Sequence, residues 1–311
     1  SAKPRNAETP KMYLKSWITA NSVFFDRNQG EIPEKLIDLA EWQLTIDGEV
    51  ETPLNITFET LLNMPKAIAA NTLECSGNSR SLLEKKASGN PWTIGGVGNA
   101  VWGGVWLKDL LAKAGATPSA KHVAFEGFDR PLGKSQIKFI RSIPIEKAMS
   151  STLLAYEMNG EPLPLKHGFP LRGLALGWTG ANCVKWLSRI TLLSEPYSGF
   201  YMDQVYRIHQ PDQDPKTGEH VTDIEIKSII TQPEPEAEPE VEAEEVDERP
   251  RGRREDRSKS RREDRGRARG SDRGRSRRDD DLDEPLENDE DDRRDESVDE
   301  PREDRSDERR G

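Results

Sequence analysis

Every aromatic residue of this 311-residue chain lies in its first 230 residues, and this limits what each part can fold into. Residues 231–311 contain 32 acidic and 21 basic side chains but no Phe, Trp or Tyr, whereas residues 1–230 hold 25 of each charge. A segment without large apolar side chains cannot bury enough surface to offset the entropy of folding. We therefore expect residues 1–230 to form one folded domain and residues 231–311 a disordered, charged, low-complexity tail.

The tail is divided into blocks of opposite charge. Residues 251–280 hold 14 basic and 7 acidic side chains, and residues 281–311 hold 16 acidic and 6 basic ones. Arginine interspersed with Ser, Gly or Asp occurs in disordered segments that bind RNA or acidic partners. The acidic flanks compete for the same arginines, so a nucleic acid or protein partner of the tail is a weak hypothesis.

Cysteine content and hydropathy exclude several classes of protein. The two cysteines, Cys75 and Cys183, make neither a disulfide framework nor a CxxC pair for structural zinc. No run of about 18 apolar residues is present, so we expect no membrane span. The chain starts at Ser1 and not at Met, which suggests processing or trimming, so the sequence itself leaves the compartment open.

Hydrophobic patterning predicts short strands and short helices in irregular order. Residues 1–41 lack a period and are expected to wrap a core through Trp17, Phe24, Phe25 and Ile32. Alternation over 42–46 before Asp47-Gly48 predicts a strand, a turn and a second strand. The predicted helices are 58–64 and 105–114; further strands are predicted at 67–74, 122–127, 152–158, 171–176, within 185–193 and at 223–230. Because the regular βαβ rhythm is absent, the sequence predicts an α+β fold.

The segment Asn71–Arg80 is the strongest candidate for chemistry. An apolar run ends at Cys75, and small or turn-forming residues follow, which places the thiol where backbone can approach a ligand closely. Arg80, five residues later, would supply positive potential that keeps the thiol ionised and attracts an anion. Composition alone favours the alternative, in which a lone cysteine is a small buried core residue.

Six segments of the chain resemble, in order, the sulfite oxidase family of molybdenum enzymes. The cysteine loop is similar to the family's Cys-Ala-Gly-Asn-Arg-Arg, and Tyr206 follows Lys185 by 21 residues, as the family's active-site tyrosine does. The other matching segments are 24–29 (FFDRNQ), 125–129 (FEGFD), 154–163 (LAYEMNGEPL), 167–172 (HGFPLR) and 180–187 (GANCVKWL). The resemblance implies a mixed-sheet, molybdopterin-binding fold of the sulfite oxidase type.

The resemblance also implies a molybdenum-pterin cofactor and the residues that hold it. Cys75 would be the protein's thiolate ligand to molybdenum, a soft donor that supplements the dithiolene sulfurs of the pterin. Arg172, His167 and Lys185 would bind the cofactor's phosphate, and Asn28, Asp129 and the backbone near Cys183 would bind the pterin. The whole cofactor-binding set is Phe25, Arg27, Asn28, Gln29, Asp129, His167, Arg172, Cys183, Val184 and Lys185.

For catalysis, the resemblance implies oxidation of sulfite, or a related sulfur oxyanion, to sulfate by oxygen-atom transfer. Arg27 and Arg80 match the family's anion-binding arginines, Trp92 matches its pocket tryptophan, and the Tyr206 hydroxyl would bond the substrate. Electrons would pass to an external acceptor such as a cytochrome or oxygen. An alternative on the same fold is the reduction of nitrate or a sulfoxide. Each residue also has a structural alternative: core for Trp92, surface for Tyr206, ion pairing for Arg27 and Arg172, an ordinary hydrogen-bonded histidine for His167.

The chain departs from the family pattern at several positions. Gln29 stands where the family has His, Ser79 replaces the first of two arginines, and Cys183 is an extra thiol that either packs or is open to oxidation. Residues 226–231 resemble the start of the family's C-terminal immunoglobulin-like dimerisation domain, yet a Pro/Glu stretch follows at once. We therefore expect that domain to be largely missing, which puts the family homodimer in doubt and predicts weak activity or poor solubility. The resemblance favours a periplasmic, other extracytoplasmic or organellar compartment.

Overall fold

The computed structural model describes residues 5–33, 37–84, 89–132, 137–208, 213–214 and 217–231. These residues all belong to one compact unit, Ser1–Glu240. The predicted tail lies outside the described residues except for Thr231, so its boundary and its disorder stay predictions. Among the described residues, no helix is long and apolar enough to cross a membrane.

One five-stranded sheet has the order β2-β1-β10-β5-β6. Its strands are β1 (Gln43–Gly48), β2 (Leu54–Thr57), β5 (His122–Gly127), β6 (Ile140–Pro144) and β10 (Leu187–Leu193). β1 runs parallel to β10, and the other pairs are antiparallel. The sheet is therefore mixed, and the predicted α+β class is confirmed.

A second five-stranded sheet carries the candidate site. It consists of β3 (Ala67–Glu74), β4 (Val97–Trp106), β7 (Thr152–Met158) and β8 (Glu161–Pro162) in that order, with β9 (Arg172–Ala175) also paired to β7. All of these pairs are antiparallel, and all eight residues of β3 pair with β4. A two-stranded ladder, β11 (Arg207–Ile208) and β12 (Glu219–His220), lies apart from both sheets.

The helices are short, and local sequence explains where they end. The α-helices are α1 (Phe58–Leu62), α2 (Leu107–Ala114), α3 (Ile145–Ser151) and α4 (Phe200–Asp203); the 3-10 helices are η1 (Lys11–Tyr13), η2 (Arg80–Leu82), η3 (Leu165–His167) and η4 (Gly180–Asn182). The Thr57 hydroxyl accepts a hydrogen bond from the Thr60 amide at the start of α1. Gly115, at a φ of 68°, ends α2 in the left-handed conformation that glycine commonly adopts after a helix.

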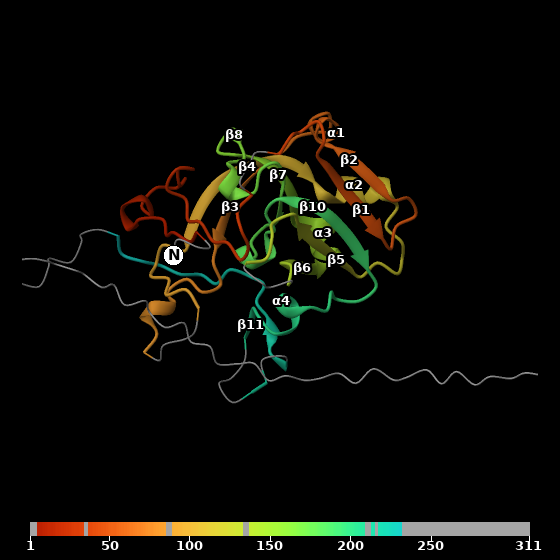
Figure 1. The fold of residues 1–311 in the computed structure, drawn as a ribbon. Coiled ribbons are helices and arrows are strands. Elements are labelled where there is room, and N and C mark those ends of the chain that lie inside the picture. Colours follow the sequence, from red (N-terminus) through yellow and green to blue (C-terminus); the bar gives the residue numbers. More distant parts are fainter. Residues whose placement is uncertain are drawn as a thin grey trace, which may run out of the picture. The chain divides into compact units, whose positions relative to one another are not determined.

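Two apolar clusters hold the sheets together. One lies against the mixed sheet and includes the buried face of α2, whereas the other surrounds the second sheet and includes Phe24, Phe25, Cys75 and Trp102. α2 contacts α3, β7 and β4, and Figure 1 shows β3 and β4 on the side of the body that carries the N-terminal segment. Cys75 therefore belongs to the second cluster, at the end of a fully paired strand.

The structure corrects three expectations. Asp47 and Gly48 are the last residues of β1 and not a two-residue turn, because the connection to β2 takes residues 49–53. Trp17 is 78% exposed and does not anchor the N-terminal segment to the core. No strand forms over 223–230, because Asp223 makes only an isolated bridge to Trp178 and Ile226 is fully exposed.

Candidate active site

Cys75 lies where β3 ends and a tight loop begins. Its backbone amide donates to the Gly96 carbonyl oxygen at 2.8 Å, and its own carbonyl accepts from the Asn78 amide at 2.8 Å. The loop then turns through Ser79, which has a φ of 68°. The predicted position of the thiol at the mouth of a strand is confirmed, and the side chain is 9% exposed.

The Cys75 thiol opens into a cavity that collects residues from distant parts of the chain. The empty space between its lining residues, with the open solvent at its mouth included, is about 710 Å³. Of the predicted site residues, the lining includes Phe25, Arg27, Asn28, Gln29, Cys75, Asp129, His167, Arg172, Cys183, Val184, Lys185 and Tyr206. It also includes Phe24, Ser76, Phe139, Gly180, Ala181 and Trp186, which sequence reasoning missed as site residues.

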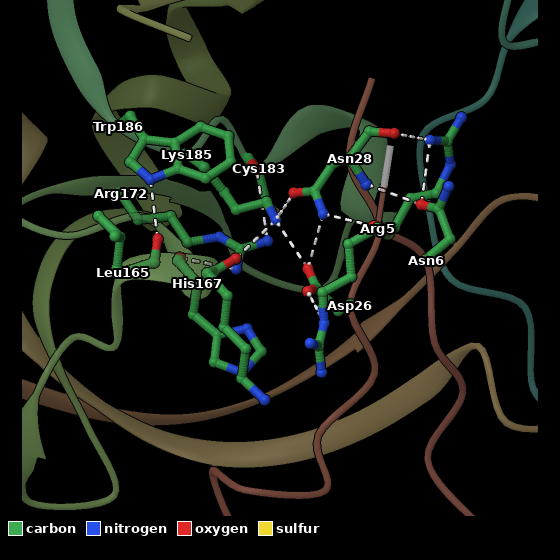
Figure 2. A network of polar contacts seen from close by, with 12 residues as sticks. Arg5, Asn6, Asp26, Asn28, Leu165, His167, Arg172, Cys183, Lys185 and Trp186 are labelled. Atoms are coloured by element: carbon green, nitrogen blue, oxygen red, sulfur yellow. Dashed lines mark hydrogen bonds and ion pairs between the residues drawn. The ribbon is translucent and has the colours of Figure 1, made fainter. Parts of the chain in front are cut away.

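Buried basic groups form one wall of the cavity (Figure 2). Arg172 donates to the carbonyl oxygens of His167 at 3.1 Å and Cys183 at 3.5 Å, and its Nε has no hydrogen-bond partner among the described residues. Burial lowers the pKa of Arg172 to about 10 and that of Lys185 to about 8. Both side chains remain cationic at neutral pH, so this wall presents positive charge in a poorly solvated place, which favours an anion.

His167 contributes to the same wall as a neutral group. It is 1% exposed, and burial together with the charges of Lys185 and Arg172 lowers its pKa to about 2. Its Nε2 lies 3.4 Å from the Asn21 carbonyl oxygen. His167 therefore offers a cofactor a hydrogen bond but no charge at neutral pH.

Lys185 holds together the residues on the next wall. Its Nζ donates to the Lys166 carbonyl oxygen at 2.8 Å, pairs with Asp26 at 3.3 Å and donates to the side-chain oxygen of Asn28. The Asn28 amide in turn donates to Asp26 at 3.0 Å. Figure 2 shows these three side chains converging on one another, so the lysine ammonium and the Asn28 amide have fixed orientations. Asp26 is a supporting residue that sequence reasoning missed.

Asp129 is the one carboxylate that lines the cavity among the described residues. Burial raises its pKa to about 6, although the charge of Lys185 opposes this rise. Close packing explains its fixed place, since a Cβ added at Gly30 or at Gly127 would lie 2.7 Å from a carboxylate oxygen of Asp129. Only glycine fits at these two positions without displacing the carboxylate.

Gln29 and Tyr206 close the cavity from two segments far apart in the sequence. The Gln29 amide donates to the Tyr206 hydroxyl oxygen, and the guanidinium carbon of Arg141 lies 5.3 Å from the centre of the tyrosine ring. Burial raises the pKa of Tyr206, so the hydroxyl stays protonated and remains a hydrogen-bond donor. Tyr206 is therefore a cavity residue, and the surface alternative for it is wrong.

Arg27 lines the cavity, and hydrogen bonds to neutral groups hold its guanidinium there. Its guanidinium donates to the side-chain oxygen of Asn6 at 3.3 Å and to the Asn28 carbonyl oxygen. The described residues give Arg27 no ion pair. The described residues thus leave the charge of Arg27 without a carboxylate beside it, which suits an anion, while the ion-pair alternative stays open.

The Cys75 thiol has a raised pKa. Burial raises it, and the positive charges of Arg27 and Arg80 lower it by less than burial raises it. The expectation that Arg80 keeps the thiol ionised is therefore wrong for the protein alone. Cys75 would be held as a thiolate if it bound a metal ion, because a metal favours the deprotonated form of a coordinating thiol.

Arg80 and Trp92 do not line this cavity. The Arg80 side chain donates to the Asn90 carbonyl oxygen at 3.1 Å and packs against Gly77 and Gly89. Trp92 is 3% exposed, and its ring contacts Phe25 edge-on at 6.4 Å between centres. Its indole N–H has no partner among the described residues. Trp92 thus supports the cavity through Phe25, while its role toward substrate stays a prediction.

Cys183 is 3% exposed, and its sulfur lies 3.9 Å from the Ala175 carbonyl oxygen. Burial raises the pKa of this thiol. A buried, protonated thiol reacts slowly with oxidants, so the packing interpretation fits better than the oxidation one.

Comparison with known proteins defines the class of this fold and site. Residues 29–201 match a family described as the oxidoreductase molybdopterin binding domain. The sulfite oxidase of Arabidopsis thaliana is 36% identical over 223 residues, which are 67% of this chain and 56% of that protein. A nitrate reductase [NADH] 2 of Phaseolus vulgaris is 32% identical over 251 residues, 74% of this chain and 28% of that protein.

The fold also matches a solved structure, the sulfane dehydrogenase SoxCD of Paracoccus pantotrophus. The TM-score is 0.63 at 31% sequence identity, over 73% of this chain and 56% of that chain. The chain therefore belongs to the sulfite oxidase family of molybdopterin-binding oxidoreductases. It spans about half the length of the first relatives that it matches.

The residues of the cavity fit the molybdenum-pterin cofactor that this family implies. The thiol of Cys75 is a soft donor and lines the cavity. The guanidinium of Arg172 is buried with one N–H group unpartnered among the described residues, and such a donor suits a phosphate oxygen. Asn28, Asp129 and Lys185 offer further polar atoms around the same space. The donor set thus matches a group that carries both a soft metal and an anionic tail.

Proposed function

We propose that this protein oxidises sulfite, or a related small sulfur oxyanion, to sulfate by oxygen-atom transfer. One observation carries the proposal: the thiol of Cys75 and the guanidinium of Arg27, which makes no ion pair with a described residue, line the same cavity. A soft metal ligand beside a free positive charge suits a reaction of a small anion at a metal. The sulfite oxidase and sulfane dehydrogenase relatives support the choice of a sulfur substrate.

The chain's own residues would hold the cofactor and orient the substrate. When bound, the cofactor supplies two-electron redox chemistry and oxygen-atom transfer. Cys75 would ligate its metal, Arg172 and Lys185 would neutralise its phosphate, and His167 would add a neutral hydrogen bond. Asn28 and Asp129 would bind the pterin.

The substrate end of the cavity would be defined by Arg27 and Tyr206. Arg27 would attract the oxyanion, and the protonated Tyr206 hydroxyl would donate a hydrogen bond to it. Gln29 keeps that hydroxyl oriented through its own amide. Arg80 lies outside the lining but near enough to affect the Cys75 pKa, so it would add positive potential and not a direct contact.

The electron acceptor and the compartment are further parts of the proposal. Electrons would leave to an external acceptor such as a cytochrome or oxygen, as the resemblance to the sulfite oxidase family implies. The family resemblance favours a periplasmic, other extracytoplasmic or organellar location.

The proposed function is tested on protein expressed with cofactor biosynthesis intact. Molybdenum is measured per chain, and sulfite-dependent reduction of ferricyanide is followed together with sulfate formation. We expect about one molybdenum per chain and one sulfate for every two ferricyanide ions reduced, since the reaction transfers two electrons. Molybdenum-loaded protein that forms no sulfate would leave the fold correct and the proposed substrate wrong.

A second candidate is the reduction of nitrate. The similarity to a nitrate reductase favours it, since the two proteins share most of the length of this chain. The same loaded protein, given nitrate and a reduced viologen dye, decides between the two. Nitrite formation without sulfite turnover would replace the first proposal with the second.

A further inference from the structure

A short N-terminal segment pairs with the residues that line the substrate end of the cavity. Ala7 and Asp26 exchange backbone hydrogen bonds of 2.9 and 2.8 Å. Two residues before Ala7, the Arg5 carbonyl oxygen accepts from the Asn28 side chain at 2.6 Å, and the Arg5 side chain forms an ion pair with Asp26 at 3.3 Å. Asn6 is therefore held on both sides, which fixes its backbone next to Arg27.

The side-chain oxygen of Asn6 accepts two hydrogen bonds at this place. The backbone amide of Asn28 donates at 2.9 Å, and the guanidinium of Arg27 donates at 3.3 Å. In Figure 2, Asn6 lies beside Asn28, on the far side of the polar network from His167. The side-chain oxygen of Asn6 thus links the Asn28 backbone to the Arg27 guanidinium, and both of these residues line the cavity.

The next residues connect this wall to the loop that supports Cys75. The Glu8 carboxylate accepts from the backbone amides of Thr93 at 2.6 Å and Gly95 at 3.1 Å. Buried Thr9 accepts from the Phe25 amide at 3.0 Å and donates to the Val97 carbonyl oxygen at 2.8 Å. Because the adjoining Gly96 carbonyl holds the Cys75 amide, the segment 6–9 spans both sides of the site.

The neutrality of Asn6 suits an anion site. A carboxylate at the same place would make similar hydrogen bonds but would pair with Arg27 and cancel its charge. The amide positions the guanidinium and leaves the charge available. We propose that Asn6 is a positioning residue for the substrate, which orients the Arg27 guanidinium toward the cavity while keeping its charge free for an oxyanion.

This inference rests on the proposed function only for the identity of the oxyanion. The test compares molybdenum-loaded wild type with Asn6→Asp and Asn6→Ala, and it measures the dissociation constant of sulfate by calorimetry as well as kcat and KM for sulfite. Asn6→Asp keeps an acceptor oxygen, so this variant would behave as wild type if Asn6 only supported the structure. Asn55→Asp is the matched control, because Asn55 is exposed on β2, accepts a hydrogen bond from Thr45 and undergoes the same change of charge.

For Asn6→Asp we expect sulfate binding to weaken about tenfold and the sulfite KM to rise by a similar factor, with kcat changed less than KM. For Asn6→Ala we expect a smaller change of about threefold, because one hydrogen bond is lost without new charge. Asn55→Asp should behave as wild type. Wild-type sulfate binding in Asn6→Asp would overturn the inference.

Two further outcomes keep the tests separate. If wild type binds sulfate but does not oxidise sulfite, and Asn6→Asp still weakens sulfate binding, the inference holds and the proposed substrate fails. If Asn6→Asp does not retain molybdenum, Asn6→Ala and Asn6→Gln carry the test, because both stay neutral. Sulfate binding and a sulfite KM equal to those of wild type in both variants would overturn the inference.

Discussion

At the scale of single residues, the basic wall of the cavity combines two cations with one neutral histidine. Arg172 and Lys185 keep their charge despite lowered pKa values, whereas His167 loses its charge entirely at neutral pH. The two cations and the burial of the ring exclude a third positive charge at this place. A lower pH should therefore decrease the stability of the folded protein, because the unfolded chain binds a proton at His167 more readily than the folded one.

The substitution His167→Gln is expected to make the protein less sensitive to acid. The pKa of His167 is about 2 in the folded protein and near 6.5 in the unfolded chain, so between these values the unfolded chain binds more protons. Stability attributable to this group is complete above pH 6.5 and falls as the pH drops below it. Lowering the pH from 7 to 5 should cost wild type about 2 kcal/mol more than the variant.

Urea unfolding of both proteins at pH 7 and pH 5 measures this difference, and carboxylates common to both proteins cancel in the comparison. An equal loss of stability in wild type and His167→Gln would show that His167 becomes protonated without unfolding.

Most site residues could be predicted because the motifs that carry them are contiguous. Segments 24–29 and 167–172 each deliver several lining residues at once. The sequence does not predict roles for Asn6, Asp26 and Arg141. Their roles depend on contacts between distant parts of the chain, such as the packing of Arg141 on Tyr206. The sequence predicts Trp92 in the pocket, yet Trp92 does not line the cavity and contacts the lining residue Phe25.

At the scale of secondary structure, the strand β4 packs behind the cavity lining, because Gly98 lies against the ring of Phe24. It pairs with β3 on one side and β7 on the other, and its glycines let neighbouring groups approach. The sequence did not predict β4, because its glycines interrupt the apolar pattern that marks a strand. By contrast, β3, β5 and β7 have the predicted bounds, and none of them contains a glycine before its last residue.

Gly98 in β4 tests the link between strand packing and the cavity. A Cβ at this position would lie 2.6 Å from the ring of Phe24, which lines the cavity and contacts His167 edge-on. We expect Gly98→Ala to displace that ring, to destabilise the protein by about 1–3 kcal/mol and to lower the molybdenum content. Thermal unfolding and metal analysis measure the two effects.

Gly160→Ala serves as the control for this substitution, because a Cβ there would meet nothing within 4 Å. Its positive φ of 79° carries a cost in stability, but the cavity is untouched. Full molybdenum content in Gly98→Ala would show that the Phe24 ring is not needed where the structure places it.

At the scale of the whole molecule, the folded body and the tail are predicted to be independent. The aromatic residues and the candidate site lie before residue 231, and the family match covers residues 29–201. A chain ending at Thr231 should therefore keep the melting temperature and the molybdenum content of the full chain. A truncated protein that aggregates or loses molybdenum would contradict the predicted boundary.

The same pair of proteins tests the weak hypothesis of a nucleic acid partner. Binding to RNA through arginines falls steeply as salt rises, because counterions are released from the phosphates. Filter binding should show salt-dependent retention of RNA by the full chain and none by the truncated one. Absence of retention by the full chain at low salt would remove the hypothesis.

The central claim is that the sulfur of Cys75 is a ligand of molybdenum in this cavity, and X-ray absorption spectroscopy at the molybdenum edge tests it most directly. The measurement counts the sulfur neighbours of the metal in wild type and in Cys75→Ser, each loaded with cofactor. The structure predicts one sulfur neighbour fewer in the variant, together with loss of turnover. An unchanged number of sulfur neighbours would contradict the assignment of Cys75 as a ligand.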